Sequence, residues 1–144
     1  MIIDANVLLY AANASAPAHP VAKRWLQDAL NGPTQVGLPW QSLTAFLRLS
    51  TSPRSYPKPL TPGQALTQID AWLASPTAWI PTEGAQHLSI VTDLLVSHGI
   101  TGPLVMDAKI AALAIEHGVD VVSTDGDFAR FTEIRWRNPL AQEG

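Results

Sequence analysis

The sequence predicts an α/β fold in which helices cover both faces of a mostly parallel central sheet. Short apolar runs, typical of buried strands, alternate along the chain with longer stretches that repeat apolar residues at helical spacing. The chain has 144 residues, of which 47% are hydrophobic and 15% charged, so it is long enough to bury a substantial core. We therefore expect residues 1–144 to form a single domain.

Strands are predicted where short apolar runs contain β-branched residues. The first, Met1–Asp4, passes into a turn or a short helix at Val7–Tyr10, and Val119–Thr124 is the clearest strand of the chain. The other three predicted strands span 35–38, 78–80 and 134–137.

Helices are predicted where apolar residues recur every three or four positions and the ends carry recognisable signals. Thr61, Pro62 and Gln64 match a capping box, in which the threonine and glutamine side chains accept each other's backbone N–H groups. Gly99 and Gly118 stand where two helices should end. The expected helices run from Pro20 to Leu30, Pro39 to Leu49, Thr61 to Ala74, Gly84 to His98, and Asp107 to the residue before Gly118.

Composition narrows the function classes. The chain has no cysteine, which excludes disulfides and thiolate metal sites and fits a cytoplasmic location. No apolar stretch approaches the roughly 20 residues of a membrane helix, and the N-terminus does not resemble a secretory signal, so no membrane association is expected. Ser52–Pro59, with three prolines, is predicted to be an exposed connection, and Gln142–Gly144 a frayed tail.

Aspartates end three of the apolar runs. Asp4, Asp107 and Asp125 each follow such a run, and Asp127 comes two residues later. The carboxyl ends of parallel strands form the edge where ligands bind in α/β proteins, and right-handed connections can bring these residues together. Carboxylates gathered there repel one another unless a cation lies between them, and Mg2+ prefers such oxygen ligands. The pattern therefore predicts metal-dependent chemistry, although each aspartate alone could serve as a turn or helix-cap residue.

Net charge alone argues against a nucleic-acid partner, but the distribution does not. The formal charge is −3, whereas setting aside the four aspartates leaves 8 acidic against 9 basic residues. Arg48, Arg54 and Lys58 lie in a stretch without acidic residues, and arginines recur near the C-terminus. Basic patches beside an acidic metal site suit a polyanion bound through its phosphates.

Three segments resemble the acidic motifs of PIN domains, and more narrowly those of VapC-type toxins of bacterial type II toxin–antitoxin systems. They are Met1–Leu8, Met106–Ala114 and Ser123–Phe128, and the closing Phe131–Pro139 is also similar to the end of that family's chains. The resemblance implies a PIN-like three-layer α/β/α sandwich. It also implies an endoribonuclease that depends on Mg2+ or Mn2+, is inhibited by a cognate antitoxin and forms a homodimer.

The resemblance also assigns site residues. Asp4, Asp107 and Asp125 match metal ligands, and Asp127 matches a further catalytic carboxylate of the last motif. Asn6 and Thr124 match polar positions that orient ligands or phosphate. The implied reaction is in-line attack of water on a phosphodiester, with the metal activating both, which leaves a 5′-phosphate.

The second motif departs from the family pattern. Many PIN domains carry a glutamate there, whereas residues 41–48 contain no acid and Thr44 or a neighbour takes its place. Glu116 lies nine residues beyond Asp107, about two and a half helical turns along, and is no obvious substitute. Operation with one metal ion, or with a second that arrives with the substrate, is the preferred interpretation, and weak or absent catalysis is the alternative.

Several further residues are candidates for contact with RNA or antitoxin. Arg48, Lys109 and Arg137 are the basic residues nearest the motifs, and Trp40 and Trp136 could stack on bases. Two other functions stay open at this point. One is a catalytically silent module that binds RNA or a partner. The other is a phosphohydrolase with Asp4 as nucleophile, although such enzymes generally need an aspartate at the position of Asn6.

Overall fold

A five-stranded parallel sheet forms the centre of the protein in the computed structural model, which describes residues 1–141. The strands lie in the order β3-β2-β1-β4-β5, and every neighbouring pair is parallel. The predicted parallel sheet is therefore confirmed, with strands shorter than expected. Their bounds are β1 Ile2–Ile3, β2 Val36–Gly37, β3 Ala78–Trp79, β4 Val121–Val122 and β5 Trp136–Arg137.

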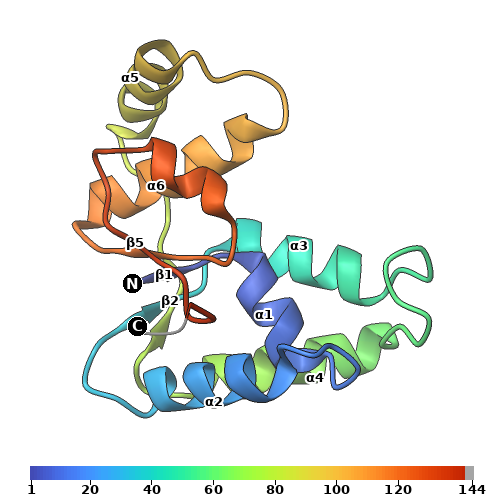
Figure 1. Ribbon diagram of the computed structural model, residues 1–144. Coiled ribbons are helices and arrows are strands. Elements are labelled where there is room, and N and C mark those ends of the chain that lie inside the picture. The colour runs from blue at the N-terminus through green and yellow to red at the C-terminus, as the bar shows by residue number, and fades with distance from the viewer. Residues whose placement is uncertain (142–144) are drawn as a thin grey trace.

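Helices connect the strands and pack on both faces of the sheet. In Figure 1, α1 to α4 lie on one side of the strands, and α5 and α6 lie on the other. A 3-10 helix, η1, spans Gly126–Arg130 after β4. The α-helices are α1 Ala5–Ala12, α2 His19–Leu30, α3 Trp40–Ser50, α4 Pro62–Leu73, α5 His87–His98 and α6 Leu104–His117.

Consecutive residues of the central strands point into separate cores, as the strand period of two requires. Ile3 and Val122 pack with α1 to α4, whereas Ile2 and Val121 pack with α5, α6 and the phenylalanine of η1. All four side chains are 0% exposed. The predicted three-layer α/β/α sandwich is confirmed by this arrangement.

The helix-end signals read from the sequence are present. Thr61 N–H donates to Gln64 Oε1 at 2.9 Å and Gln64 N–H donates to Thr61 Oγ1 at 3.2 Å, which completes the capping box of α4. Gly99 and Gly118 end α5 and α6 with φ of 60° and 64°, a left-handed conformation that favours glycine.

Two predicted helix starts are wrong. Asp107 does not open its helix, because the apolar run Leu104–Met106 is already the first turn of α6 rather than the end of a strand. α5 begins at His87 and not at Gly84, and Gly84 lies in the preceding connection with its N–H donating to Glu116 Oε1 at 2.9 Å. At the N-terminus the undecided segment is a helix, α1, capped by Asp4.

Two other expectations concern the ends of the chain and the membrane. The predicted frayed tail at Gln142–Gly144 lies outside the described residues. Among residues 1–141, no helix combines the length and apolar character needed to cross a bilayer.

Candidate metal centre

The parallel pairing of β1 with β4 brings distant segments of the chain to one sheet edge. Asp4 directly follows β1, and its N–H donates to the carbonyl of Val122 in β4 at 2.9 Å. Ser123 directly follows β4, and two residues later Asp125 caps η1. The carboxyl ends of both central strands therefore meet where the sequence predicts a ligand site.

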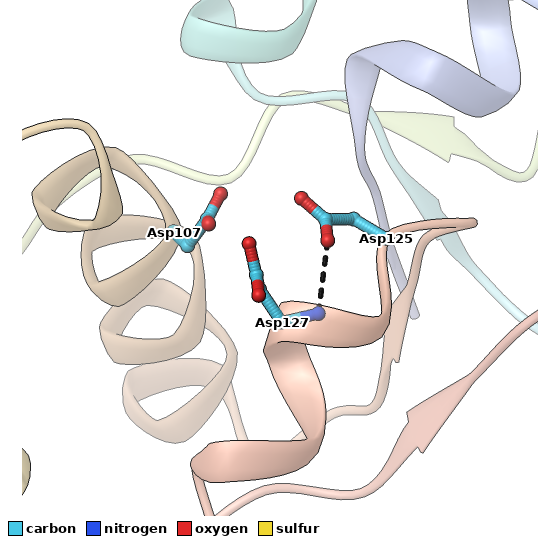
Figure 2. A group of neighbouring side chains, drawn as sticks. All are labelled: Asp107, Asp125 and Asp127. Carbon is cyan, nitrogen blue, oxygen red and sulfur yellow. Dashed lines mark hydrogen bonds between the residues drawn. The ribbon is translucent and has the colours of Figure 1, made fainter.

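Three carboxylates converge at this edge. Asp107, Asp125 and Asp127 each offer an oxygen, and these atoms lie within 4.8 Å of one another. Figure 2 shows the Asp107 side chain reaching from α6 toward the two aspartates of the η1 segment. Asp127 N–H donates to Asp125 Oδ1 at 2.9 Å, so the capping turn itself positions the pair. Asp125 therefore caps η1 and contributes an oxygen to the cluster at the same time.

Asp4 lies beside this group without belonging to it. Its carboxylate accepts from Ala5 N–H at 2.8 Å, which caps α1, and from Ser123 Oγ at 2.7 Å. Its charge nevertheless acts on Asp107, whose pKa it helps to raise. Asp4 therefore borders the three-carboxylate cluster as a fourth acidic group.

A polar network holds Asp4 and the η1 segment together. Asn6 donates from Nδ2 to Asp4 Oδ2 at 3.3 Å and to Ser123 Oγ at 3.0 Å, and its Oδ1 accepts the Thr124 N–H at 3.1 Å. Asn6 thus contacts both Asp4 and the segment that follows β4. Thr124 contributes its backbone N–H to this network.

Ser123 is the residue of this network that the sequence reading missed. It is 0% exposed, donates to Asp4 and accepts the Asp125 N–H at 3.0 Å. The indole N–H of Trp136, which is partly buried, donates to the Ser123 carbonyl at 2.9 Å. A buried hydroxyl at the end of an apolar strand needs a polar partner, and that requirement was the available signal.

The charges of the cluster are poorly compensated by the protein. Burial, followed by the negative charges of Asp125, Asp4 and Asp127, raises the pKa of Asp107 to about 6 against a weaker opposing effect of Arg130. Burial also raises the pKa of Asp4, although hydrogen bonds from Ser123 and Ala5 oppose it. Carboxylate oxygens that repel one another across a few ångströms fit a hard divalent cation such as Mg2+ or Mn2+.

Helix α3 is tied to both elements that carry the first two aspartates. Ser42 Oγ donates to the Ile3 carbonyl at 2.7 Å, and Gln41 Nε2 donates to the Met106 carbonyl at 2.9 Å. Neither contact was predicted. Thr44 is exposed on the same helix and supplies no carboxylate, and Glu116 is engaged with Gly84 and His87 instead.

The predicted phosphate-binding cations are distributed differently. Lys109 follows Asp107 by two residues, but its ammonium pairs with Glu83. Arg137 pairs with Asp120 at 3.4 Å. Asp120 precedes β4, so this ion pair lies at the amino ends of the strands, opposite the carboxylates. Arg48 is exposed near the end of α3. Arg130, one of the arginines of the predicted basic group near the C-terminus, pairs with Asp127 at 3.2 Å and is therefore a cation that the structure brings to the cluster.

Comparison with known proteins now identifies the class. The model of the PIN domain family matches residues 1–134. The chain belongs to the PIN domain family.

Within that family, the chain is similar to several mycobacterial VapC proteins. It is 44% identical over 140 residues to ribonuclease VapC37 of Mycobacterium tuberculosis, covering 97% of each chain. It is also 39% identical over 142 residues to ribonuclease VapC33 of the same organism, covering 99% of each. These relatives place the chain with the VapC-type members of the family.

Solved structures share the fold. A crystal structure of VapBC2 from Rickettsia felis, bound to a promoter DNA fragment, matches with a TM-score of 0.69 at 19% identity, covering 95% of this chain and 96% of the other. The toxin VapC20 of Mycobacterium tuberculosis, described as cleaving the sarcin-ricin loop, matches with a TM-score of 0.66 at 21% identity, covering 93% and 98%.

Proposed function

We propose that this chain is a metal-dependent endoribonuclease toxin of a type II toxin–antitoxin system. The observation that carries the proposal is the convergence of Asp107, Asp125 and Asp127 within 4.8 Å, with Asp4 beside them. Support comes from the likeness to VapC37, which is named a ribonuclease and is 44% identical to almost the whole chain. Residues 1–144 act as one domain in this proposal.

In the proposed site, Asp107, Asp125 and Asp127 hold Mg2+ or Mn2+, and Asp4 is either a further ligand or a partner of coordinated water. A divalent cation held by these carboxylates would lower the pKa of an attacking water and polarise the scissile phosphodiester. The chain itself supplies positioning. Asn6 and Ser123 fix the Asp4 carboxylate, and the capping bond from Asp127 N–H fixes Asp125.

Arg130 has a second task in this proposal. Its guanidinium already lies at the cluster through Asp127, and Nε donates to the Asp127 carbonyl at 3.1 Å. A phosphate that approaches the carboxylates would be attracted by this guanidinium, which offsets part of their repulsion. In-line attack by water would leave a 5′-phosphate on the product.

A catalytically silent binding module is the second candidate, favoured by one observation. The exposed positions of α3 carry no carboxylate, so the site has no acid where many family members have a glutamate. A phosphohydrolase with Asp4 as nucleophile is less well supported, because Asn6, in the place of the needed acid, donates to Asp4 instead.

Partners follow from the same proposal. The substrate is RNA, and a cognate antitoxin binds the toxin and inhibits it. The active form is a homodimer in the cytoplasm. Solved relatives support the antitoxin partner, since several are complexes of VapB with VapC, including one from Salmonella typhimurium bound to DNA.

The decisive experiment compares growth and RNA integrity after induced expression. Wild-type protein should arrest growth, and the purified protein should cut total cellular RNA with Mg2+ or Mn2+ and leave it intact with EDTA. Asp107→Asn should abolish both effects, whereas the matched control Asp93→Asn, at an exposed position of α5, should abolish neither.

The outcomes separate the candidates. RNA that is bound but never cut, with toxicity unchanged in Asp107→Asn, would establish the silent module. Relief of growth arrest by the product of an adjacent reading frame would support the antitoxin. Sedimentation of the purified chain at the mass of a monomer would remove the homodimer from the proposal.

A further inference from the structure

Helix α3 presents one exposed stripe to solvent. Its exposed residues are Trp40, Thr44 and Arg48, and the regular four-residue spacing places them on one face. We propose that this stripe binds single-stranded RNA, with Trp40 stacking on an unpaired base next to the scissile phosphate and Arg48 contacting a backbone phosphate. The inference rests on the proposed function.

The stripe begins at the carboxylate site. Gln41, next to Trp40, donates to the carbonyl of Met106, which immediately precedes Asp107. Ser42 donates to the carbonyl of Ile3, which immediately precedes Asp4. These two bonds fix the start of α3 against both elements that bear the first two aspartates, so a nucleotide leaving the site meets α3 next.

Trp40 is unusual for its exposure. Its side chain is 60% exposed, and Met106, whose carbonyl accepts from the adjacent Gln41, is 51% exposed. An indole in water costs free energy that core packing would recover, and an aromatic face is a stacking surface for any base. Trp136, the other tryptophan considered from the sequence, is engaged through its indole N–H with Ser123 and is not equivalent.

The order of chemistry along the stripe suits a nucleotide chain. An aromatic ring lies at the site end, a hydroxyl lies in the middle and a guanidinium lies at the far end, with no carboxylate among them. Eight residues of helix separate Trp40 from Arg48, a rise of roughly 12 Å. Arg48 can therefore neutralise a phosphate away from the site, where the aspartates would otherwise repel the backbone.

A protein partner is less well matched to this surface. A stable interface needs about 800 Å² on each partner, with an apolar centre. Here two exposed apolar side chains, Trp40 and Met106, adjoin polar positions of α3. The other large exposed hydrophobic residues of the described chain lie on other elements: Val21 on α2, Leu66 on α4, and Leu88 and Val96 on α5.

The test measures binding to three dodecamer probes in an Asp107→Asn background, which prevents cleavage. The probes are oligoadenosine, oligouridine and an abasic oligomer with the same ribose-phosphate backbone. Trp40→Leu keeps an apolar side chain but removes the ring, Trp40→Phe keeps a ring, and Leu88→Ala is the control on another exposed apolar position. Melting temperatures establish that each variant is folded.

We expect Trp40→Leu to weaken binding of the two base-containing dodecamers about tenfold and to leave the abasic oligomer unchanged, because stacking contributes per base. Trp40→Phe should recover most of the affinity. Arg48→Ala should weaken all three probes and reduce the slope of log affinity against log salt by about 0.7, the value for one single-strand phosphate contact.

Three results would overturn the inference. The first is equal affinity of the parent protein for abasic and base-containing probes. The second is unchanged binding in Trp40→Leu. The third is a change of sedimenting mass in Trp40→Leu, which would show that the stripe is a contact between two copies of the chain. With Asp107 restored, Trp40→Leu should raise KM for RNA cleavage. Wild-type KM in that variant refutes only the stripe, whereas absence of cleavage by the wild-type chain refutes the proposed function.

Discussion

Helix α6 separates two groups of charged side chains that are built in opposite ways. On one side Asp107 faces Asp125 and Asp127, with their oxygens within 4.8 Å. On the other, Lys109 and Glu116 of the same helix meet residues that precede or begin α5. Glu83 pairs with Lys109, and His87 Nδ1 lies 2.8 Å from Glu116 Oε2.

The pKa values of Asp107 in the first group and Glu83 in the second move in opposite directions. Burial and neighbouring carboxylates raise the pKa of Asp107 to about 6, whereas the hydrogen bond from Lys109 lowers the pKa of Glu83. In the second group each acid has a basic partner in the protein, so the group joins α6 to the segment before α5. In the first group the acids oppose one another, which a protein retains when a ligand is to supply the missing charge.

The largest expected effect is loss of catalysis in Asp107→Asn. Removing one carboxylate of the cluster should reduce RNA cleavage about 10³-fold, because the metal ion whose charge stabilises the transition state loses one of its ligands. The metal-free variant should nonetheless melt no lower than wild type, because the repulsion with Asp125 disappears. Cleavage and thermal unfolding of the same preparation check both statements, and a less stable variant with normal cleavage would contradict the comparison.

The next effect is stabilisation by metal. At a concentration 100 times its Kd, a divalent ion that binds only the folded chain stabilises it by about 2.7 kcal/mol. For a protein of this size that raises Tm by roughly 5–10 °C. Mn2+ should produce this rise in wild type and not in Asp107→Asn, as measured by calorimetry with EDTA as reference. An equal rise in both proteins would locate the ion elsewhere.

Glu116→Ala should act on the second group alone. The change leaves the Gly84 N–H and His87 without their acceptor, and because the Glu116 side chain is only 8% exposed, unfolding should become easier by about 2 kcal/mol. Urea denaturation measures the loss. Glu133→Ala is the control, since that acid is 39% exposed and its pair with His98 should contribute less than about 1 kcal/mol. Cleavage should persist in both variants, and its abolition in Glu116→Ala would show that the groups are coupled.

The pH dependence of the first group follows from the raised pKa of Asp107. The folded protein binds the Asp107 proton more tightly than the unfolded chain does. The stabilisation that this proton provides is therefore fully present below the ordinary pKa of 3.8 and is lost as pH rises through about 6. For a half-buried carboxyl the metal-free protein should lose about 1 kcal/mol across that interval. Mn2+ affinity should run the other way and rise roughly tenfold from pH 5 to 7, because the ion needs the deprotonated acid. Titration calorimetry tests this, and a flat profile contradicts it.

The smallest expected effect belongs to Lys109→Met. Both Lys109 and its partner Glu83 are partly exposed, so their ion pair should contribute less than about 1 kcal/mol. If Lys109 serves only that pair, KM for RNA cleavage should stay within about twofold of wild type. A larger rise in KM would restore the phosphate-contact role that the sequence predicts.

Much of the fold could be predicted because its signals are local. The capping box at Thr61, the terminating glycines and the alternation of strands with helices are all read within a few residues. The start of α6 failed because Leu104–Met106 is an apolar run too short to distinguish strand from helix by periodicity. Tertiary packing on α5 and the sheet decides its state.

The acidic residues of the candidate site could be selected from the sequence, whereas the residues that hold them in position could not. Asp4 and Asp125 are marked by their positions after buried strands, and parallel topology predicts that such positions meet. Asp107 reaches the same place from the first turn of α6, so the reason for which the sequence selected it, the end of a strand, is wrong. The bonds of Ser123, Ser42 and Gln41 join residues dozens of positions apart. The partner of Lys109 depends on how α6 lies against the segment before α5, and the partner of Arg137 depends on the pairing of β5 with β4. No local pattern encodes these tertiary arrangements.

The central place of β1 has a consequence for how the protein is made. Ser123 donates to Asp4 across 119 positions of sequence, and β1 lies between β2 and β4. During translation the first aspartate leaves the ribosome long before the segments that carry the other three. The carboxylate cluster therefore needs residues made late in translation, and a nascent chain that ends before Ser123 lacks two of the three converging aspartates.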